Sequence, residues 1–136
     1  MPVVHDVAMR SAVPPTDAEL AALRVLWDQG PCTVRAVHDT LYHDSDVGYT
    51  TTLKLLQNLR AKRLVRRDDT GKQHVFEAIV TEAATMRQHV GRLVDATFNG
   101  SSAELAMRAL EARPVSASEL AELKRMVAAL KARDQR

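Results

Sequence analysis

The chain has 136 residues, of which 46% are hydrophobic, and its 19 lysines and arginines stand against 17 aspartates and glutamates. This length allows one domain or two small ones. The single cysteine, Cys32, excludes an internal disulfide framework and a cysteine-rich metal site. No uninterrupted apolar run approaches the ~18 residues needed to span a bilayer. Met1 to Val13 lack the pattern of a signal peptide, so we expect a cytoplasmic protein without membrane insertion.

The first 15 residues show no hydrophobic period and end in Pro14-Pro15, which predicts a flexible arm over residues 1–15. Thr16-Asp-Ala-Glu19 has the spacing of a capping box and predicts the start of a first helix. That helix runs to about Asp28, where Gly30-Pro31 ends it. Its predicted buried side consists of Leu20, Leu23, Leu26 and Trp27.

Two more helices follow in this half of the chain. Thr33 is the predicted cap of a helix from about Val34 to Tyr42, and the next helix spans residues 49–63. The helix over 49–63 buries a leucine stripe of Leu53, Leu56 and Leu59. Its opposite side is polar and is formed by Thr50, Thr51, Lys54, Gln57 and Asn58.

A basic β-hairpin is predicted directly after the third helix. Two short strands flank the turn Asp68-Asp69-Thr70-Gly71. Between Tyr49 and Phe76 seven basic residues meet two acidic ones, a local charge of +5. Because the whole chain carries +2, the remainder sums to −3, and the positive field is concentrated on the third helix and the hairpin.

Three helices followed by a basic hairpin predict a winged helix-turn-helix over residues 16–80, and therefore double-stranded DNA as partner. Side chains on the third helix are predicted to contact base edges: Thr50, Thr51, Lys54, Gln57 and Asn58. Basic residues around the hairpin are predicted to contact phosphates: Lys62, Arg66, Arg67 and Lys72. The alternative is a winged helix used as a protein-interaction module, which would favour a hydrophobic open face on that helix.

The second half of the chain is predicted to be helical throughout. The expected helices are residues 82–99, ended by Gly100, then 101–112, and a last one opened by the capping box Ser116-Ala-Ser-Glu119. About 55 residues in three helices form a marginal core alone. We therefore expect residues 81–132 to be a dimerisation domain whose interface includes Leu93, Phe98, Leu105, Leu120, Leu123 and Val127. The alternative is an intramolecular bundle leaning on the N-terminal domain.

Other chemistry has little support in the sequence. His38 and His43 are close in the chain, but a surface histidine pair is more often solvated than metal-bound. Cys32 precedes a helix N-terminus, so it is either a redox-sensitive thiol or a small buried structural residue. No nucleophile–base grouping, phosphate loop or carboxylate pair stands out. We expect no enzyme activity, no cofactor and no metal.

The chain resembles the penicillinase-repressor family, the BlaI/MecI group of regulators, over about residues 16–131. The matching residues are Thr16-x-x-Glu19, Leu26-Trp27, Thr33-Val-Arg-Ala-Val37, Tyr49-Thr-Thr, Leu56-Gln57-x-Leu59, Lys62-x-Leu64-Val65, Asp69-Thr-Gly-Lys-Gln-His74, Phe76, Phe98-x-Gly100-Ser101 and Leu120-x-x-Leu123. The resemblance implies a mainly α fold and a homodimeric repressor on a palindromic operator. It also implies release when a membrane sensor-protease pathway cleaves the C-terminal domain.

Three single positions and one residue pair depart from the family pattern. Arg63 stands where the family usually has glycine after the recognition helix, so an arginine is expected to take a left-handed conformation at some cost. Asn58 stands where the family often has arginine, and Lys54 where it often has threonine. These differences predict an operator sequence that differs from those of other family members. The Asn-Phe pair cleaved in some members is replaced by Arg108-Ala109, and control by proteolysis is therefore not implied by these residues.

Overall fold

A computed structural model describes residues 13–134 of the chain. Contacts divide the chain into two compact units, one ending at His89 and the other beginning at Val90. The division falls inside helix α5 (Glu82–Thr97), so the first turns of α5 belong with the N-terminal unit. The predicted arm over residues 1–15 lies outside the described residues except for its last three positions.

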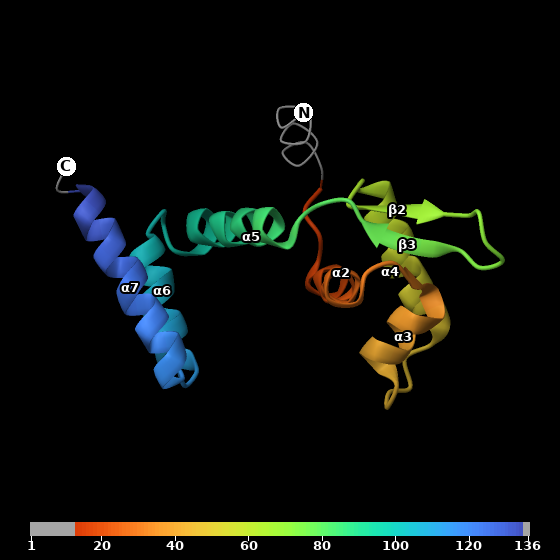
Figure 1. The fold of residues 1–136 in the computed structure, drawn as a ribbon, viewed down its shortest axis with the longest axis horizontal. Helices are drawn as coiled ribbons and strands as arrows, with labels where there is room; N and C mark the ends of the chain where they lie inside the picture. The colour runs from red at the N-terminus through yellow and green to blue at the C-terminus, as the bar shows by residue number, and fades with distance from the viewer. Residues whose placement is uncertain (1–12, 135–136) are drawn as a thin grey trace. The chain divides into compact units, whose positions relative to one another are not determined.

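Besides the first turns of α5, the described part of the N-terminal unit contains three helices and a small antiparallel sheet (Figure 1). The helices are α2 (Asp17–Gln29), α3 (Val34–Tyr42) and α4 (Tyr49–Ala61). The strands are β1 (Cys32–Thr33), β2 (Val65–Asp68) and β3 (Val75–Ala78). The sheet order is β1-β3-β2, which places β3 in the middle. This is the predicted winged helix-turn-helix.

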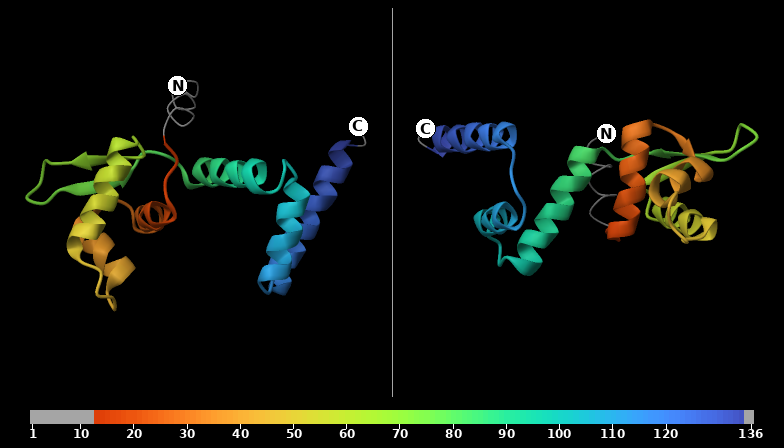
Figure 2. Two further views of the ribbon diagram at one scale, coloured as in Figure 1. Left: turned by 180° about the vertical axis from the view of Figure 1, so that it is seen from behind. Right: turned by 90° about the horizontal axis from the view of Figure 1, so that it is seen from below.

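Strand β1, which extends the predicted hairpin to a three-stranded sheet, was not predicted from the sequence. Cys32 and Thr33 pair with Phe76 and Val75, while β2 pairs with β3 from Val65–Ala78 to Asp68–Val75. A strand of two residues is too short to show an alternating hydrophobic pattern, so only the β2–β3 hairpin left a signal. Figure 2 shows this hairpin projecting beyond the helices of its own unit, as a wing does.

The core of this unit is aliphatic apart from Phe76, and it holds α4 against the other helices. Leu23 and Leu26 of α2, Val37 of α3, and Leu56 and Leu59 of α4 are buried together. Leu20, Trp27, Leu41 and Leu53 pack on this cluster but remain partly exposed. Burying such side chains contributes roughly 1.5–3 kcal/mol each, so the packing fixes which side of α4 is left for a partner.

Helix α4 ends in a motif that requires a left-handed residue. Arg63 has φ 65°, and this confirms the conformation expected at the position where glycine is usual. The Leu64 N–H donates to the Leu59 carbonyl and the Arg63 N–H to the Arg60 carbonyl, both at 3.0 Å. These two bonds form a Schellman motif, which turns the chain sharply from α4 into β2.

The C-terminal unit contains most of α5, then α6 (Ser102–Ala112) and α7 (Ala117–Asp134). Ser101 caps α6 by accepting from the Glu104 N–H at 3.1 Å. Ser116 and Glu119 form the predicted capping box, and the Ser116 N–H keeps the pKa of the Glu119 carboxyl below its ordinary value. Neither α6 nor α7 has a buried residue, so their apolar side chains are open in the single chain.

Candidate nucleic-acid interface

The exposed side of α4 is the first part of the candidate interface. The predicted base-contacting residues lie together on this side: Thr50, Thr51, Lys54, Gln57 and Asn58, of which Asn58 is half-buried and the others exposed. Their spacing of one, four, seven and eight residues from Thr50 places them on one face of a helix. The buried residues Thr52, Leu56 and Leu59 occupy the opposite face. The residues predicted from the sequence are thus on one surface.

A buried hydrogen bond orients this helix. Thr52 is fully buried, and its hydroxyl lies 2.7 Å from Nδ1 of His38 on α3. The His38 ring also packs near Tyr42 and Tyr49, with ring centroids 5.7 and 6.0 Å away. His43 instead contacts Asp44 at 2.9 Å, so the two histidines that are close in the sequence are used separately. His38 therefore serves the packing of α3 on α4.

The wing arginines already have partners within the chain. Arg66 pairs with Glu77 across the strands, with Arg66 Nε donating to Oε1 at 2.6 Å. Arg67 contacts Asp69 at 2.7 Å, and His74 contacts the same Asp69 oxygen at 2.7 Å. Burial acts to raise the pKa of Asp69, but the hydrogen bond and charge of Arg67, together with His74, outweigh it and lower this pKa. Arg67 thus shares its carboxylate with a histidine.

The turn of the wing is shaped by Asp68. Its carboxylate accepts from the Thr70 hydroxyl at 2.7 Å and from the Thr70 N–H at 2.9 Å. These bonds lower the pKa of Asp68 and keep it ionised. The turn leaves Lys72 exposed near the tip, where a cation can meet a phosphate.

Lys62 is placed differently from the prediction. Its ammonium pairs with the buried Glu19 of α2 and donates to the Pro14 carbonyl at 3.0 Å. The same Glu19 oxygen accepts from the Thr16 N–H at 3.0 Å, as part of the predicted capping box. The Lys62 side chain is 16% exposed and that of Glu19 4%. Lys62 therefore joins the C-terminal end of α4 to α2, and we leave it out of the proposed phosphate contacts.

A cavity of about 340 Å³ lies between α3, α4 and the wing. Its polar lining includes Arg35 and Tyr49 from the two helices, together with Arg67, Lys72 and His74 from the wing. Arg35 lies over the Tyr49 ring, with its guanidinium carbon 4.7 Å from the ring centroid. Arg35 and Tyr49 were not predicted as site residues, because the sequence gives no sign that these segments meet.

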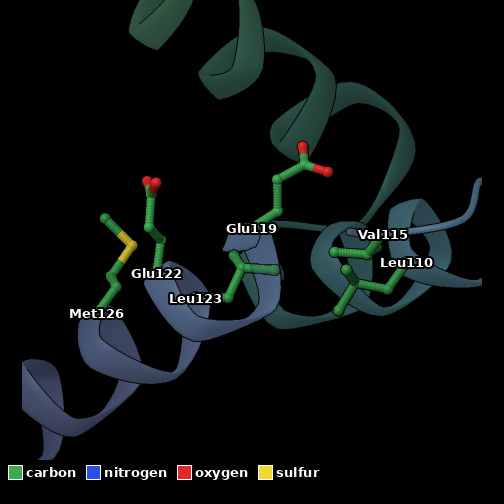
Figure 3. A pocket seen from close by; sticks show the side chains of 6 residues that line it. All are labelled: Leu110, Val115, Glu119, Glu122, Leu123 and Met126. Atoms are coloured by element: carbon green, nitrogen blue, oxygen red, sulfur yellow. The ribbon is translucent and has the colours of Figure 1, made fainter. Parts of the chain in front are cut away.

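The predicted dimer-interface residues are partly or fully open in the single chain. Leu93, Leu120, Leu123 and Val127 are exposed, whereas Phe98 and Leu105 are half-buried. A groove of about 400 Å³ also lies in this unit, with Leu110 and Val115 beside each other and Leu123 and Met126 carried by α7 (Figure 3). Glu119 and Glu122 form its polar edge. The apolar surface expected of this unit is present.

Cys32 is buried in β1, and its thiol lies 3.2 Å from the Gly30 carbonyl. Burial raises the pKa of this thiol, which makes the reactive thiolate scarcer. This environment favours the structural role over the redox-sensitive one. Across residues 13–134 no group of three or more metal-ligating side chains comes together, and no helix is long and apolar enough to cross a membrane.

The sequence matches the penicillinase repressor family over residues 15–129. It is 31% identical over 119 residues to the transcriptional regulator BlaI of Mycobacterium tuberculosis, in strains CDC 1551 and H37Rv, which covers 85% of this chain and 84% of that protein. Among solved structures, a MarR family protein from Bacillus stearothermophilus overlays with a TM-score of 0.47 at 20% identity, over 91% of this chain and 78% of that one. That overlay is too loose to bear on the site.

Proposed function

The chain belongs to the penicillinase repressor family and is a DNA-binding transcriptional regulator, and we propose that it represses transcription as a homodimer on a palindromic operator. The observation that carries this proposal is the polar face of α4, which is exposed beside a basic wing while its opposite face is buried. A helix presented in this way fits the major groove, and a wing beside it reaches the backbone.

Base contacts are assigned to Thr50, Thr51, Lys54 and Asn58, with Gln57 at the edge of the face. Genomic fragments recovered by binding to the full-length protein supply the operator for the test. Replacing a residue that contacts a base should cost about 1–3 kcal/mol on that operator and much less on random DNA. If Lys54→Ala and Asn58→Ala weaken both DNAs equally, α4 does not supply the specificity.

Dimerisation is assigned to the open apolar surface of the C-terminal unit. Along α7, Leu120, Leu123, Val127 and Leu130 follow a 3-4-3 spacing, as in helices that pack against a partner. A single winged helix buries too little surface for tight specific binding, so operator affinity should depend on pairing. In a symmetric dimer the two half-sites are about one helical turn of DNA apart, or a multiple of it.

Sedimentation of the full-length protein tests the dimer. The intact chain should sediment as a dimer at micromolar concentration, while Leu123→Asp should sediment as a monomer and bind the operator poorly. Ala132→Asp places the same charge on α7 outside the apolar row and should remain dimeric. A monomeric intact chain, or a monomeric Leu123→Asp variant that binds the operator as tightly as the intact protein, would reject the homodimer.

We infer that the inducing signal acts on the C-terminal unit. The apolar surface of α6 and α7 is the part on which the proposed pairing depends, so a change there separates the two DNA-binding units without touching α4. Winged-helix residues lie in a different compact unit. A signal of this kind should lower operator affinity and dimer content together, which sedimentation in the presence of operator would measure.

A further inference from the structure

The cavity between α3, α4 and the wing has the charge of an anion site. Arg35, Arg67 and Lys72 contribute three permanent cations to its lining, and none of the described residues that line it is acidic. Its lining also includes apolar side chains, among them Leu53 and Phe76. Apolar walls around converging donors are typical of ligand sites, and they strengthen the attraction between a cation and an anion.

Arg35 and Lys72, which line this cavity, differ from the basic residues that have carboxylate partners. Arg66 forms an ion pair with Glu77, Arg67 with Asp69, and Lys62 with Glu19. In the part of the chain that the structure describes, no ion pair involves Arg35 or Lys72. A phosphate can therefore approach these two cations without breaking an existing pair.

Tyr49 holds Arg35 in place. A guanidinium stacked on an aromatic ring keeps its N–H donors in the plane of the group and free to bind an anion at its edge. Because the side chain is already ordered by the ring, less conformational entropy is lost when an anion binds. Tyr49 is the first residue of α4 and Arg35 lies in the first turn of α3, so both helices define the position of this charge.

We propose that this cavity holds one phosphodiester group of the DNA backbone, bound by Arg35 and Lys72, with Tyr49 as a positioning residue for Arg35. The inference rests on the proposed function, since it requires DNA at the face of α4. It assigns the main phosphate contact to Arg35 and Lys72 in place of the paired strand arginines Arg66 and Arg67. A phosphate here lies next to Gln57 and fixes the register of α4 on the duplex without distinguishing one base from another.

Salt dependence of binding by the full-length protein is the first test. Because each protomer of the proposed dimer loses one contact, Arg35→Ala should reduce the salt slope of log K by about 1.8, so that raising salt fourfold weakens the wild type roughly twelvefold more than the variant. The loss should be equal on the operator and on random DNA of the same length. Arg125→Ala removes a cation from the exposed side of α7 and should leave the slope unchanged.

Tyr49→Leu separates positioning from charge. It should lower affinity while keeping nearly the full salt slope, because Arg35 is still present but no longer ordered. Arg35→Lys should likewise keep the slope and lose affinity, since an ammonium cannot stack as a planar group. Equal affinity of Tyr49→Leu and wild type would remove Tyr49 from the proposal.

A methylphosphonate scan of one operator half-site locates the phosphate. One neutralised position should weaken the wild type and Lys54→Ala clearly more than Arg35→Ala, because that variant has already lost one of the two contacts and keeps only Lys72. The inference fails if no such position exists or if Arg35→Ala keeps the full slope. If the wild type itself does not prefer the operator over random DNA, the proposed function fails instead.

Inorganic phosphate tests whether the cavity binds a free anion. Added at constant ionic strength, it should compete with DNA no better than chloride does. Stronger competition against the wild type than against Arg35→Ala would overturn the inference and assign the cavity to the free anion.

Discussion

Replacing Lys62 with methionine removes the ammonium from a pair that is nearly closed to water. The Glu19 carboxylate then keeps the Thr16 N–H but loses its counter-charge. Removing one partner of a fully buried pair costs about 3–5 kcal/mol. Because the Lys62 side chain is 16% exposed, water can partly replace the ammonium, and we expect the low end, about 3 kcal/mol. For a unit of this size that corresponds to a melting temperature lower by roughly 12–24 °C.

Circular dichroism melts of the full-length protein at one fixed concentration would measure this loss. Glu19→Gln combined with Lys62→Met should be less destabilising than the sum of the two single changes, because the pair acts as one unit. The salt slope of DNA binding should not change in Lys62→Met. Lys72→Met is the matched control, with unchanged stability and a slope smaller by about 1.8, since both protomers of the proposed dimer lose the contact. If Lys62→Met has the melting temperature of the wild type but a smaller salt slope of DNA binding, Lys62 contacts a phosphate and does not stabilise the fold.

Three further predictions test the local chemistry. Arg63→Gly relieves a left-handed residue (φ 65°) and should raise the free energy of unfolding in urea by about 0.5–1 kcal/mol, whereas Arg60→Gly inside α4 should lower it by about 1 kcal/mol. Since burial raises the pKa of the Cys32 thiol, this thiol should react with iodoacetamide at least about tenfold faster in denaturing urea than in the native protein. The raised pKa also makes stability depend on pH. The stabilisation from the protonated thiol is complete below the thiol pKa of the unfolded chain, and it is lost as pH rises through the thiol pKa of the folded protein. Equal rates would contradict burial. Asp69→Asn frees Arg67 and should strengthen binding to operator and random DNA alike, while the charge-matched Asp28→Asn should not.

The elements of the winged helix were predictable because their signals are local. Thr33 as a cap placed α3 at Val34–Tyr42, and the period of leucines in α4 placed its polar residues on one face. Ion pairs between distant segments left no such signal. Glu19 lies 43 positions before Lys62, and nothing in either segment indicates that they meet. Three of the four predicted phosphate contacts, Lys62, Arg66 and Arg67, proved to have intramolecular partners.

The cavity between α3, α4 and the wing was not predicted either, because it also depends on contacts between distant segments. A count of charges along the sequence does not reveal such contacts. The basic residues between Tyr49 and Phe76 give a correct sum, but the sum does not separate cations with carboxylate partners from cations without them. Arg35 lies outside that window altogether, on a helix whose charge is otherwise unremarkable. Its place over Tyr49 depends on how α3 packs on α4, and that packing includes the buried contact between His38 and Thr52.

Helix α2 links both ends of the DNA-binding unit, and the strengths of its contacts differ. At one side Glu19 receives Lys62 from the end of α4. At the other side Arg24 pairs with Glu82 of α5, and Trp27 donates its indole N–H to the Val80 carbonyl at 3.0 Å. The Arg24–Glu82 pair is exposed, at 45% and 47%, and solvent screening leaves such pairs with little net stabilisation. The Trp27 bond is partly buried and comes from a side chain that also packs on the core, so its loss would leave a carbonyl without its partner. The indole bond, more than the ion pair, therefore holds the chain just before α5 to α2.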